Sequence, residues 1–361
     1  METESAGPSA TAEFSVPVVL GASGITTPRM GIGSDSGVPC EALEWAFERG
    51  VNYFYWGSRR TKGMKEAIRN LAPRYREKMT IVLQTYDYTG LALEQTFLRG
   101  LKQLKIDYAD AFILGMRNKP VPERIMNKAL ALKEKGLVKH LCVSAHDRST
   151  YQGHLERKVF DLIMVRYNAA HRGADKDVFP FLPEENPPGV ICYNSTRWGN
   201  LFDPQWMPAG ERTPSPVDLY RYVLTNPHIQ MVLTAPETFE QLKENLKTLE
   251  TGPVTDEEKQ WLERIGDHVH PLNPNTNLDL LVPGRGLRKK NGKGYRDLGS
   301  GIRVQAVIPA QAGIDWLNVL RDSCLRRNDG LMGSGRRCQV DVSGLTPLCL
   351  LKQVDARSRI G

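Results

Sequence analysis

The chain has 361 residues, of which 40% are hydrophobic, and its formal net charge is +7. Its length suits one large barrel domain with an appendage. The positive charge lies in residues 272–361, which contain 15 Lys and Arg against 7 Asp and Glu, so residues 1–271 carry a net charge of −1. A body so close to neutral excludes a strong electrostatic field for binding nucleic-acid phosphates.

Cysteine spacing and hydropathy exclude further classes of protein. The 6 Cys residues form no C-x-x-C pair and no cluster with His, so we expect no metal site. Residues 1–14 lack the basic and apolar regions of a signal peptide, and no apolar run reaches the ~18 residues that span a bilayer. We therefore expect a cytoplasmic protein.

Eight short apolar segments alternate with segments of helical periodicity, which is typical of βα units around a parallel sheet. The strand segments are apolar on successive positions, as in Met79–Leu83, and this indicates a sheet covered on both faces. The predicted strands are residues 30–33, 51–56, 80–85, 110–114, 138–144, 162–167, 190–193 and 230–234. The predicted helices include residues 40–49, 91–104, 122–134, 217–224 and 239–249.

A final amphipathic helix is predicted after Thr255, a residue type that caps helix N-termini, and we expect the barrel to end near Pro271. Residues 272–361 show neither secondary-structure period and are predicted to be disordered. Two interpretations of this tail remain. It is either accidental coding sequence, which we favour because residues 307–330 resemble translated dispersed repeats of bacterial genomes, or a basic tail for nucleic acid or anionic membrane.

Residues 51–60, Val-Asn-Tyr-Phe-Tyr-Trp-Gly-Ser-Arg-Arg, resemble the second strand of the aldo-keto reductases, N-F-F-D-T-A-x-x-Y-G. The resemblance covers roughly residues 14–270. It implies a (β/α)8 TIM barrel over residues 14–271, with an N-terminal β-hairpin that plugs the barrel bottom, after a flexible N-terminus of residues 1–13.

The resemblance also implies where a catalytic tetrad of Asp, Tyr, Lys and His would lie. The Asp position falls on Tyr55 and the Tyr position on Arg60. The Lys that closes the third strand falls on Tyr86, and the His that closes the fourth falls on Gly115. All four residues differ from the family pattern, so we expect the ordinary mechanism to fail.

The cofactor contacts of the family are kept in part. Ser144 is similar to the Ser that contacts the nicotinamide carboxamide, and Tyr193 to the Tyr that stacks on the nicotinamide. Glu244 and Asn245 are similar to the adenine contacts. The resemblance thus implies NADPH or NADH as cofactor, although each residue has an alternative role in packing or at the surface. The Gln of strand six falls on Met164, and the two basic residues that hold the 2′-phosphate of NADPH fall on Ala235 and Gln241.

Reduction of a carbonyl group requires a proton donor, and an isolated phenol with a pKa of about 10 is a poor one. One hypothesis is that Tyr55 and Tyr86 form a replacement pair, assisted by the charge of Arg59 or Arg60. The alternative is that both rings fill space. His146, after the fifth strand, is a further catalytic candidate, and the neighbouring loop offers His171.

Two functions therefore remain open. The first is an NAD(P)-dependent oxidoreductase that acts on a small carbonyl or alcohol substrate with a rewired or impaired proton donor. The second is a noncatalytic relative that senses a cofactor or metabolite, or serves as an assembly partner. We expect no nucleic acid or membrane as partner of the barrel. The sequence indicates neither the substrate nor the oligomeric state.

Overall fold

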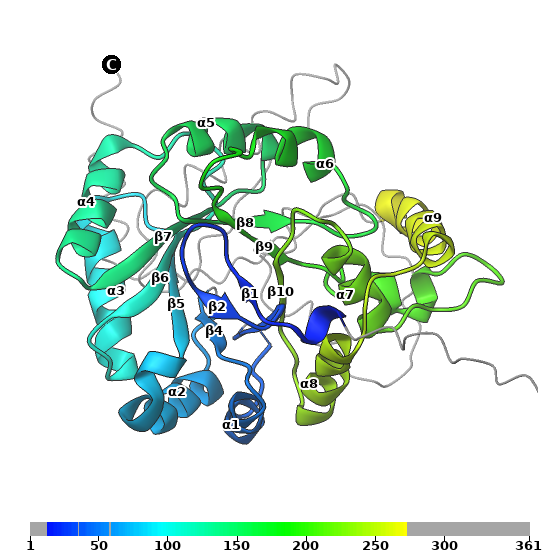
Figure 1. Ribbon diagram of the computed structural model, residues 1–361, viewed down its shortest axis with the longest axis horizontal. Helices are drawn as coiled ribbons and strands as arrows, with labels where there is room; N and C mark the ends of the chain where they lie inside the picture. The colour runs from blue at the N-terminus through cyan, green and yellow to red at the C-terminus, as the bar shows by residue number, and fades with distance from the viewer. Residues whose placement is uncertain (1–12, 35, 58, 273–361) are drawn as a thin grey trace, which may run out of the picture. The chain divides into compact units, whose positions relative to one another are not determined.

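The computed structural model describes residues 13–34, 36–57 and 59–272, and within them eight parallel strands close into a barrel (Figure 1). Strand β10 pairs with both β9 and β3, which completes the ring. The strands are β3 (Met30–Gly33), β4 (Tyr53–Trp56), β5 (Thr80–Thr85), β6 (Ala109–Leu114), β7 (Val138–Ser144), β8 (Leu162–Arg166), β9 (Gly189–Tyr193) and β10 (Met231–Thr234). The predicted barrel is confirmed, and each predicted strand is present.

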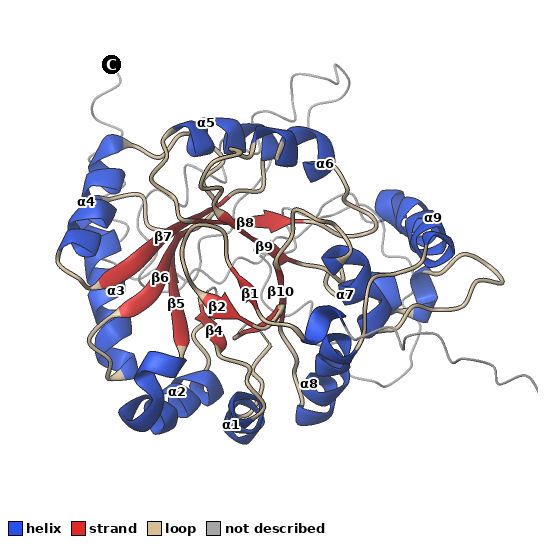
Figure 2. Ribbon diagram, viewed as in Figure 1, coloured by secondary structure: helices blue, strands red, loops and turns tan. Residues whose placement is uncertain are grey.

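The helices lie outside the ring of strands (Figure 2). They are α1 (Cys40–Glu48), α2 (Lys62–Tyr75), α3 (Gly90–Leu104), α4 (Glu123–Glu134), α5 (Tyr151–Glu156), α6 (Ala174–Asp177), α7 (Pro216–Leu224), α8 (Phe239–Leu246) and α9 (Asp256–Leu272). The helix predicted to reach residue 249 ends at Leu246 and continues as the 3-10 helix Lys247–Glu250. Thr255 caps α9 as predicted, because its Oγ1 accepts a hydrogen bond from the Glu258 amide at 3.2 Å.

Side chains that alternate along the strands pack into two hydrophobic cores, one inside the barrel and one between the strands and the helices. On β4, Tyr53 and Tyr55 pack inside the barrel, whereas Phe54 and Trp56 join the larger core between the strands and the helices. Strands β1 (Val18–Val19) and β2 (Thr26–Thr27) form the predicted N-terminal hairpin. Leu20 in its turn packs with the interior residues, so the hairpin closes the end at which the barrel strands begin.

Helix α9 packs closely against the chain that follows β8. A Cβ atom at Gly266 would lie 2.2 Å from the Ala169 carbonyl oxygen, which is backbone and cannot turn aside. We expect Gly266→Ala to lower the free energy of unfolding by about 1–3 kcal/mol. Denaturant titration measures this change. Gly153→Ala on α5 is the matched control, since nothing lies within 4 Å of its Cβ. Equal effects of the two substitutions would contradict the packing argument.

Asp161 ties β7 to the start of β8. Its carboxylate accepts hydrogen bonds from Lys133 Nζ at 2.7 Å and from the Leu141 amide at 3.0 Å. Burial opposes ionisation, but hydrogen bonds from His140, Lys133 and Leu141 outweigh it and lower the pKa of Asp161 from 3.8 to about 2.

The lowered pKa of Asp161 makes the free energy of unfolding depend on pH. A lowered pKa in the folded state stabilises the fold above pH 3.8, and the contribution is lost as the pH falls through 2. We expect Asp161→Asn to cost about 2 kcal/mol of unfolding free energy at pH 7. The difference from the wild type should shrink between pH 4 and pH 2 in denaturant titrations. A difference that stays constant over that range would contradict the assignment.

The predictions made for residues 1–12 and 273–361 lie outside the described residues. Within the described part, no helix is both long and apolar enough to cross a membrane.

Candidate active site

The carboxyl ends of the eight strands form one mouth, because all barrel strands run in the same direction. Side chains that alternate inward at these ends line the mouth. Among them are Gln84 and Tyr86 from β5 and its loop, Ser144 from β7, Arg166 from β8 and Tyr193 from β9. Aromatic rings and a few hydrogen-bonding groups therefore meet at one place, as in small-molecule sites.

Tyr55 lies inside the barrel and is only 2% exposed. Its ring crosses Gly57 so closely that a Cβ atom there would lie 1.9 Å from Cε2 of Tyr55. Only a residue without a side chain fits under the ring. The position that carries an Asp in the aldo-keto reductase pattern is therefore occupied by an aromatic ring packed with Val82 and Ile113.

Tyr86 differs from Tyr55 because it is 39% exposed at the rim of the mouth. Its ring and the amide of Gln84 cover Gly115. A Cβ atom at Gly115 would lie 2.7 Å from Cε1 of Tyr86 and 2.1 Å from Nε2 of Gln84. The space in which a His at position 115 would begin is thus taken by Gln84 of β5 and by Tyr86 of the loop after it.

Tyr193 and His146 come together from neighbouring parts of the mouth. Their ring centroids lie 5.9 Å apart, and the Tyr193 hydroxyl donates to the Ala145 carbonyl at 3.3 Å. Burial raises the pKa of Tyr193 well above its usual value, although the charge of Arg166 opposes the shift. Tyr193 is therefore a neutral ring rather than an acid at physiological pH.

Ser144 closes β7 below this pair and is 5% exposed. Its hydroxyl accepts a hydrogen bond from the Met116 amide at 3.4 Å. Of the residues predicted from the sequence, Ser144, Tyr193, His146 and Tyr86 belong to the mouth.

Arg60 occupies the family's Tyr position but faces away from the mouth. Its guanidinium donates to the carbonyls of Thr96 in α3, at 3.3 Å, and of Gln84, at 3.2 Å. It also lies 5.1 Å from the ring of Trp56, which points out of the barrel. Arg60 thus joins β5 to α3.

The adenine-contact candidates lie on α8. Asn245 is 7% exposed and donates to Thr234 Oγ1 at 2.8 Å, so its amide takes part in a buried network within the protein. Glu244 pairs with Lys247 at 2.5 Å on the outer side of the helix.

The structure argues against His171 as a proton donor. This side chain is 9% exposed, and its ring lies 5.0 Å from that of His270. Burial, and then the charges of Arg166 and Arg197, lower the pKa of His171 to about 3. It is therefore neutral near pH 7.

Sequence reasoning missed Arg166, and it placed Arg117 at the end of a strand without giving it a role. Strand β8 continues beyond Met164, so Arg166 is the next inward residue and lies above it. The sequence did contain a signal for Arg166, because it is a cation at an inward position of an otherwise apolar strand. Arg117 follows β6, and only the structure shows that it is 2% exposed.

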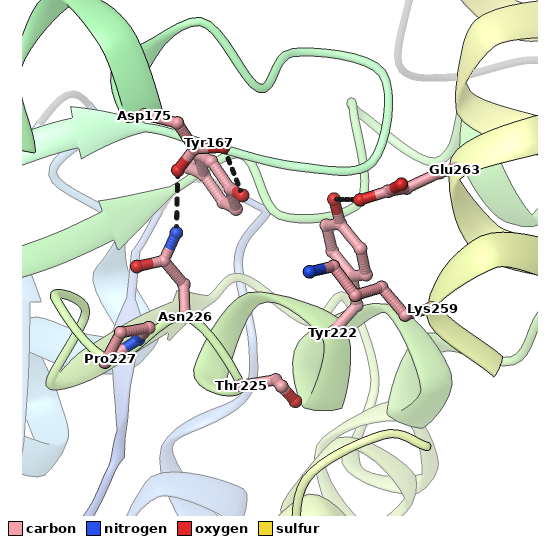
Figure 3. A pocket seen from close by; sticks show the side chains of 8 residues that line it. All are labelled: Tyr167, Asp175, Tyr222, Thr225, Asn226, Pro227, Lys259 and Glu263. Carbon is pink, nitrogen blue, oxygen red and sulfur yellow. Dashed lines mark hydrogen bonds between the residues drawn. The ribbon is translucent and has the colours of Figure 1, made fainter. Parts of the chain in front are cut away.

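A second cavity, of about 200 Å³, lies outside the barrel beside α7 and α9 (Figure 3). Its polar groups pair with one another. Tyr167 donates to Asp175 at 2.9 Å, and Tyr222 donates to Glu263 at 3.0 Å. The described residues contain no group of His, Cys, Asp and Glu that could hold a metal ion. The barrel mouth therefore remains the candidate active site.

Comparisons with known proteins agree with this geometry. Residues 30–205 match the model of the Aldo/keto reductase family. The barrel is similar to the holo form of aldo-keto reductase AKR11C1 from Bacillus halodurans, with 18% identity, a TM-score of 0.58 and coverage of 69% of this chain and 95% of that one. A candidate aldo-keto reductase from Pseudomonas aeruginosa is also 18% identical, with a TM-score of 0.53 and coverage of 67% and 96%. No curated protein matches the chain significantly.

Proposed function

Because the chain belongs to the aldo-keto reductase superfamily, we propose that it is an NAD(P)-dependent oxidoreductase with a rewired proton donor. The family and the barrel fold both support an oxidoreductase function. Its substrate is a small carbonyl compound or alcohol. One observation carries the proposal: Tyr86, Tyr193 and His146 converge above Ser144 at the mouth of a complete barrel.

The residues at the mouth fit the nicotinamide end of the cofactor. Tyr193 offers a neutral aromatic face, and Ser144 offers a hydroxyl at the end of β7. The cofactor, when bound, supplies the hydride. Since the basic residues that hold a 2′-phosphate in the family are replaced by Ala235 and Gln241, we expect little preference for NADPH over NADH.

We assign the hydrogen bond to the substrate oxygen and the transfer of the proton to different residues. Tyr86, at the exposed rim, donates a hydrogen bond to the substrate oxygen and orients it. His146, partly exposed beside Tyr193, supplies the proton. Tyr55 was an equal candidate in the sequence, but its burial favours a packing role.

Titration of the full chain with NADPH and with NADH, followed by Trp emission, tests cofactor binding. Trp198, which follows β9 and is 41% exposed, is the expected reporter. Trp56 faces outward into the core between the strands and the helices, so we do not expect it to respond. Quenching by either nucleotide at micromolar concentrations supports the proposal. No response to either, in emission or in calorimetry, would contradict it.

A noncatalytic sensor is the second candidate, and one observation favours it: Gln84 and Tyr86 fill the space above Gly115 where the family's His would begin. This alternative predicts cofactor binding without oxidation or reduction of any compound in a broad panel of aldehydes, ketones and alcohols. Turnover of any panel member that depends on Tyr86 would exclude it.

A further inference from the structure

We propose that Arg117 anchors a carboxylate group of the substrate at the edge of the barrel mouth. The inference rests on the proposed oxidoreductase function and names a substrate class for it: a carbonyl compound with an acidic group at its other end. Arg117 lies in the loop after β6, on the side of the mouth where Tyr86 reaches across from β5.

The backbone of Arg117 is held in place from two sides. Its amide donates to the Ser144 carbonyl at 2.7 Å. Its own carbonyl accepts a hydrogen bond from Thr150 Oγ1 at 3.3 Å and lies 2.9 Å from Nε2 of His154. The position of the guanidinium is therefore set by a rigid frame of β7 and α5, as a specificity residue requires.

The side chain of Arg117 is buried without complete pairing. Its Nη2 atom donates to the Asp87 carbonyl at 2.7 Å, whereas Nε and Nη1 are buried and have no hydrogen-bond partner. None of the ion pairs within residues 13–34, 36–57 and 59–272 includes Arg117. The groups that face it are the Asp87 carboxylate, which is charged, and the neutral Tyr88 phenol.

A buried guanidinium with unused donors is costly, because a charge taken out of water needs a counter-charge or a full set of hydrogen bonds. The Asp87 carboxylate faces Arg117 but forms no ion pair with it among the described residues, and one of its oxygens accepts a hydrogen bond from Thr85 Oγ1 at 2.5 Å. Arginine stays protonated even where burial lowers its pKa, and its N–H groups match the oxygens of carboxylates and phosphates. An oxyanion brought by the substrate would complete the pairing.

Tyr88 covers the guanidinium. Its ring centroid lies 5.0 Å from Cζ of Arg117, and the residue is 50% exposed. A half-exposed ring changes rotamer on a fast timescale, so its rotation opens a path to Nη1. A substrate that reaches from Arg117 to Tyr86 would place its carbonyl group at the centre of the mouth and its carboxylate at the edge.

The test measures binding to the full chain by calorimetry, with succinate and inorganic phosphate as nonreactive probes. We expect succinate to bind the wild type and Arg117→Met to weaken that binding at least tenfold, with partial recovery in Arg117→Lys. Arg69→Met is the matched control, because Arg69 also donates to a backbone carbonyl, that of Gln103, but on the exposed surface. It should bind succinate like the wild type.

Steady-state kinetics add a second readout. Arg117→Met should raise KM for 4-oxobutanoate at least tenfold and leave KM for butanal unchanged. If no substrate turns over but succinate binding still depends on Arg117, the oxidoreductase function fails and the anion site stands. Equal binding of succinate by the wild type and the folded Arg117→Met variant would overturn the anchor. Tighter, Arg117-dependent binding of phosphate would overturn the choice of carboxylate.

Discussion

Replacement of Tyr86 by Phe is expected to lower kcat by a factor of 100 or more, with little change in the affinity for the nicotinamide cofactor. Removal of a positioned donor at the reacting oxygen costs about 10²–10⁴ in rate. Tyr86 is 39% exposed in the loop after β5, and loss of its hydroxyl leaves the ring that covers Gly115 in place. Turnover of a small aldehyde, with nucleotide affinity measured in parallel, checks the prediction.

The control for this experiment is Tyr75→Phe. Tyr75 is 39% exposed, as is Tyr86, but it lies at the end of α2, outside the barrel. It should keep wild-type turnover. Tyr55→Phe should also have a small effect, because the Tyr55 ring fills the interior. If Tyr55→Phe abolished turnover and Tyr86→Phe did not, the two roles would be the reverse of those proposed.

The second large effect is expected at Tyr193. Tyr193→Ala should raise the Kd for NADPH and for NADH by about tenfold or more, since stacking of an aromatic side chain on a base ring contributes about 1–3 kcal/mol. Tyr193→Phe should bind almost as the wild type does. The hydroxyl already donates to the Ala145 carbonyl, and only the ring face is left for the cofactor.

Fluorescence titration of both variants distinguishes these outcomes. Equal affinity in Tyr193→Ala and in the wild type would show that the nicotinamide does not stack there. Glu244→Ala provides a separate test of the adenine end. Because Glu244 pairs with Lys247 on α8, we expect its loss to change cofactor affinity far less than the loss of Tyr193.

Local patterns predicted βα units around a parallel sheet, and the resemblance to the aldo-keto reductases implied that the sheet closes into a barrel. Apolar runs such as Met79–Leu83, bounded by turns and separated by helical periods, match β5 and its neighbours, and Thr255 caps α9 as its residue type predicts. Resemblance to the aldo-keto reductase pattern also led to Ser144 and Tyr193, because motif positions at the ends of strands keep their place when the fold is kept.

Side-chain direction could not be predicted in the same way. Tyr55 and Tyr86 looked equivalent in sequence, but Tyr55 is packed over Gly57 and Tyr86 is exposed at the rim. Arg60 and Gly115 show why a motif position does not determine a chemical role. Arg60 donates to the carbonyls of Thr96 and Gln84, and at Gly115 the side chains of Gln84 and Tyr86 leave no space for a larger residue.

The sequence by itself determined the alternating strands and helices and the residues at the strand ends, since both follow from periodicity and turn chemistry along the chain, and its resemblance to a family implied the (β/α)8 barrel. Tertiary structure alone decided which of those residues can meet a ligand. Burial and pairing depend on contacts between distant segments: Asn245 with Thr234, His171 among Arg166 and Arg197, and Arg117 beneath Tyr88. No local sequence pattern encodes such contacts, and these contacts determine whether a side chain is buried in packing or can reach a ligand.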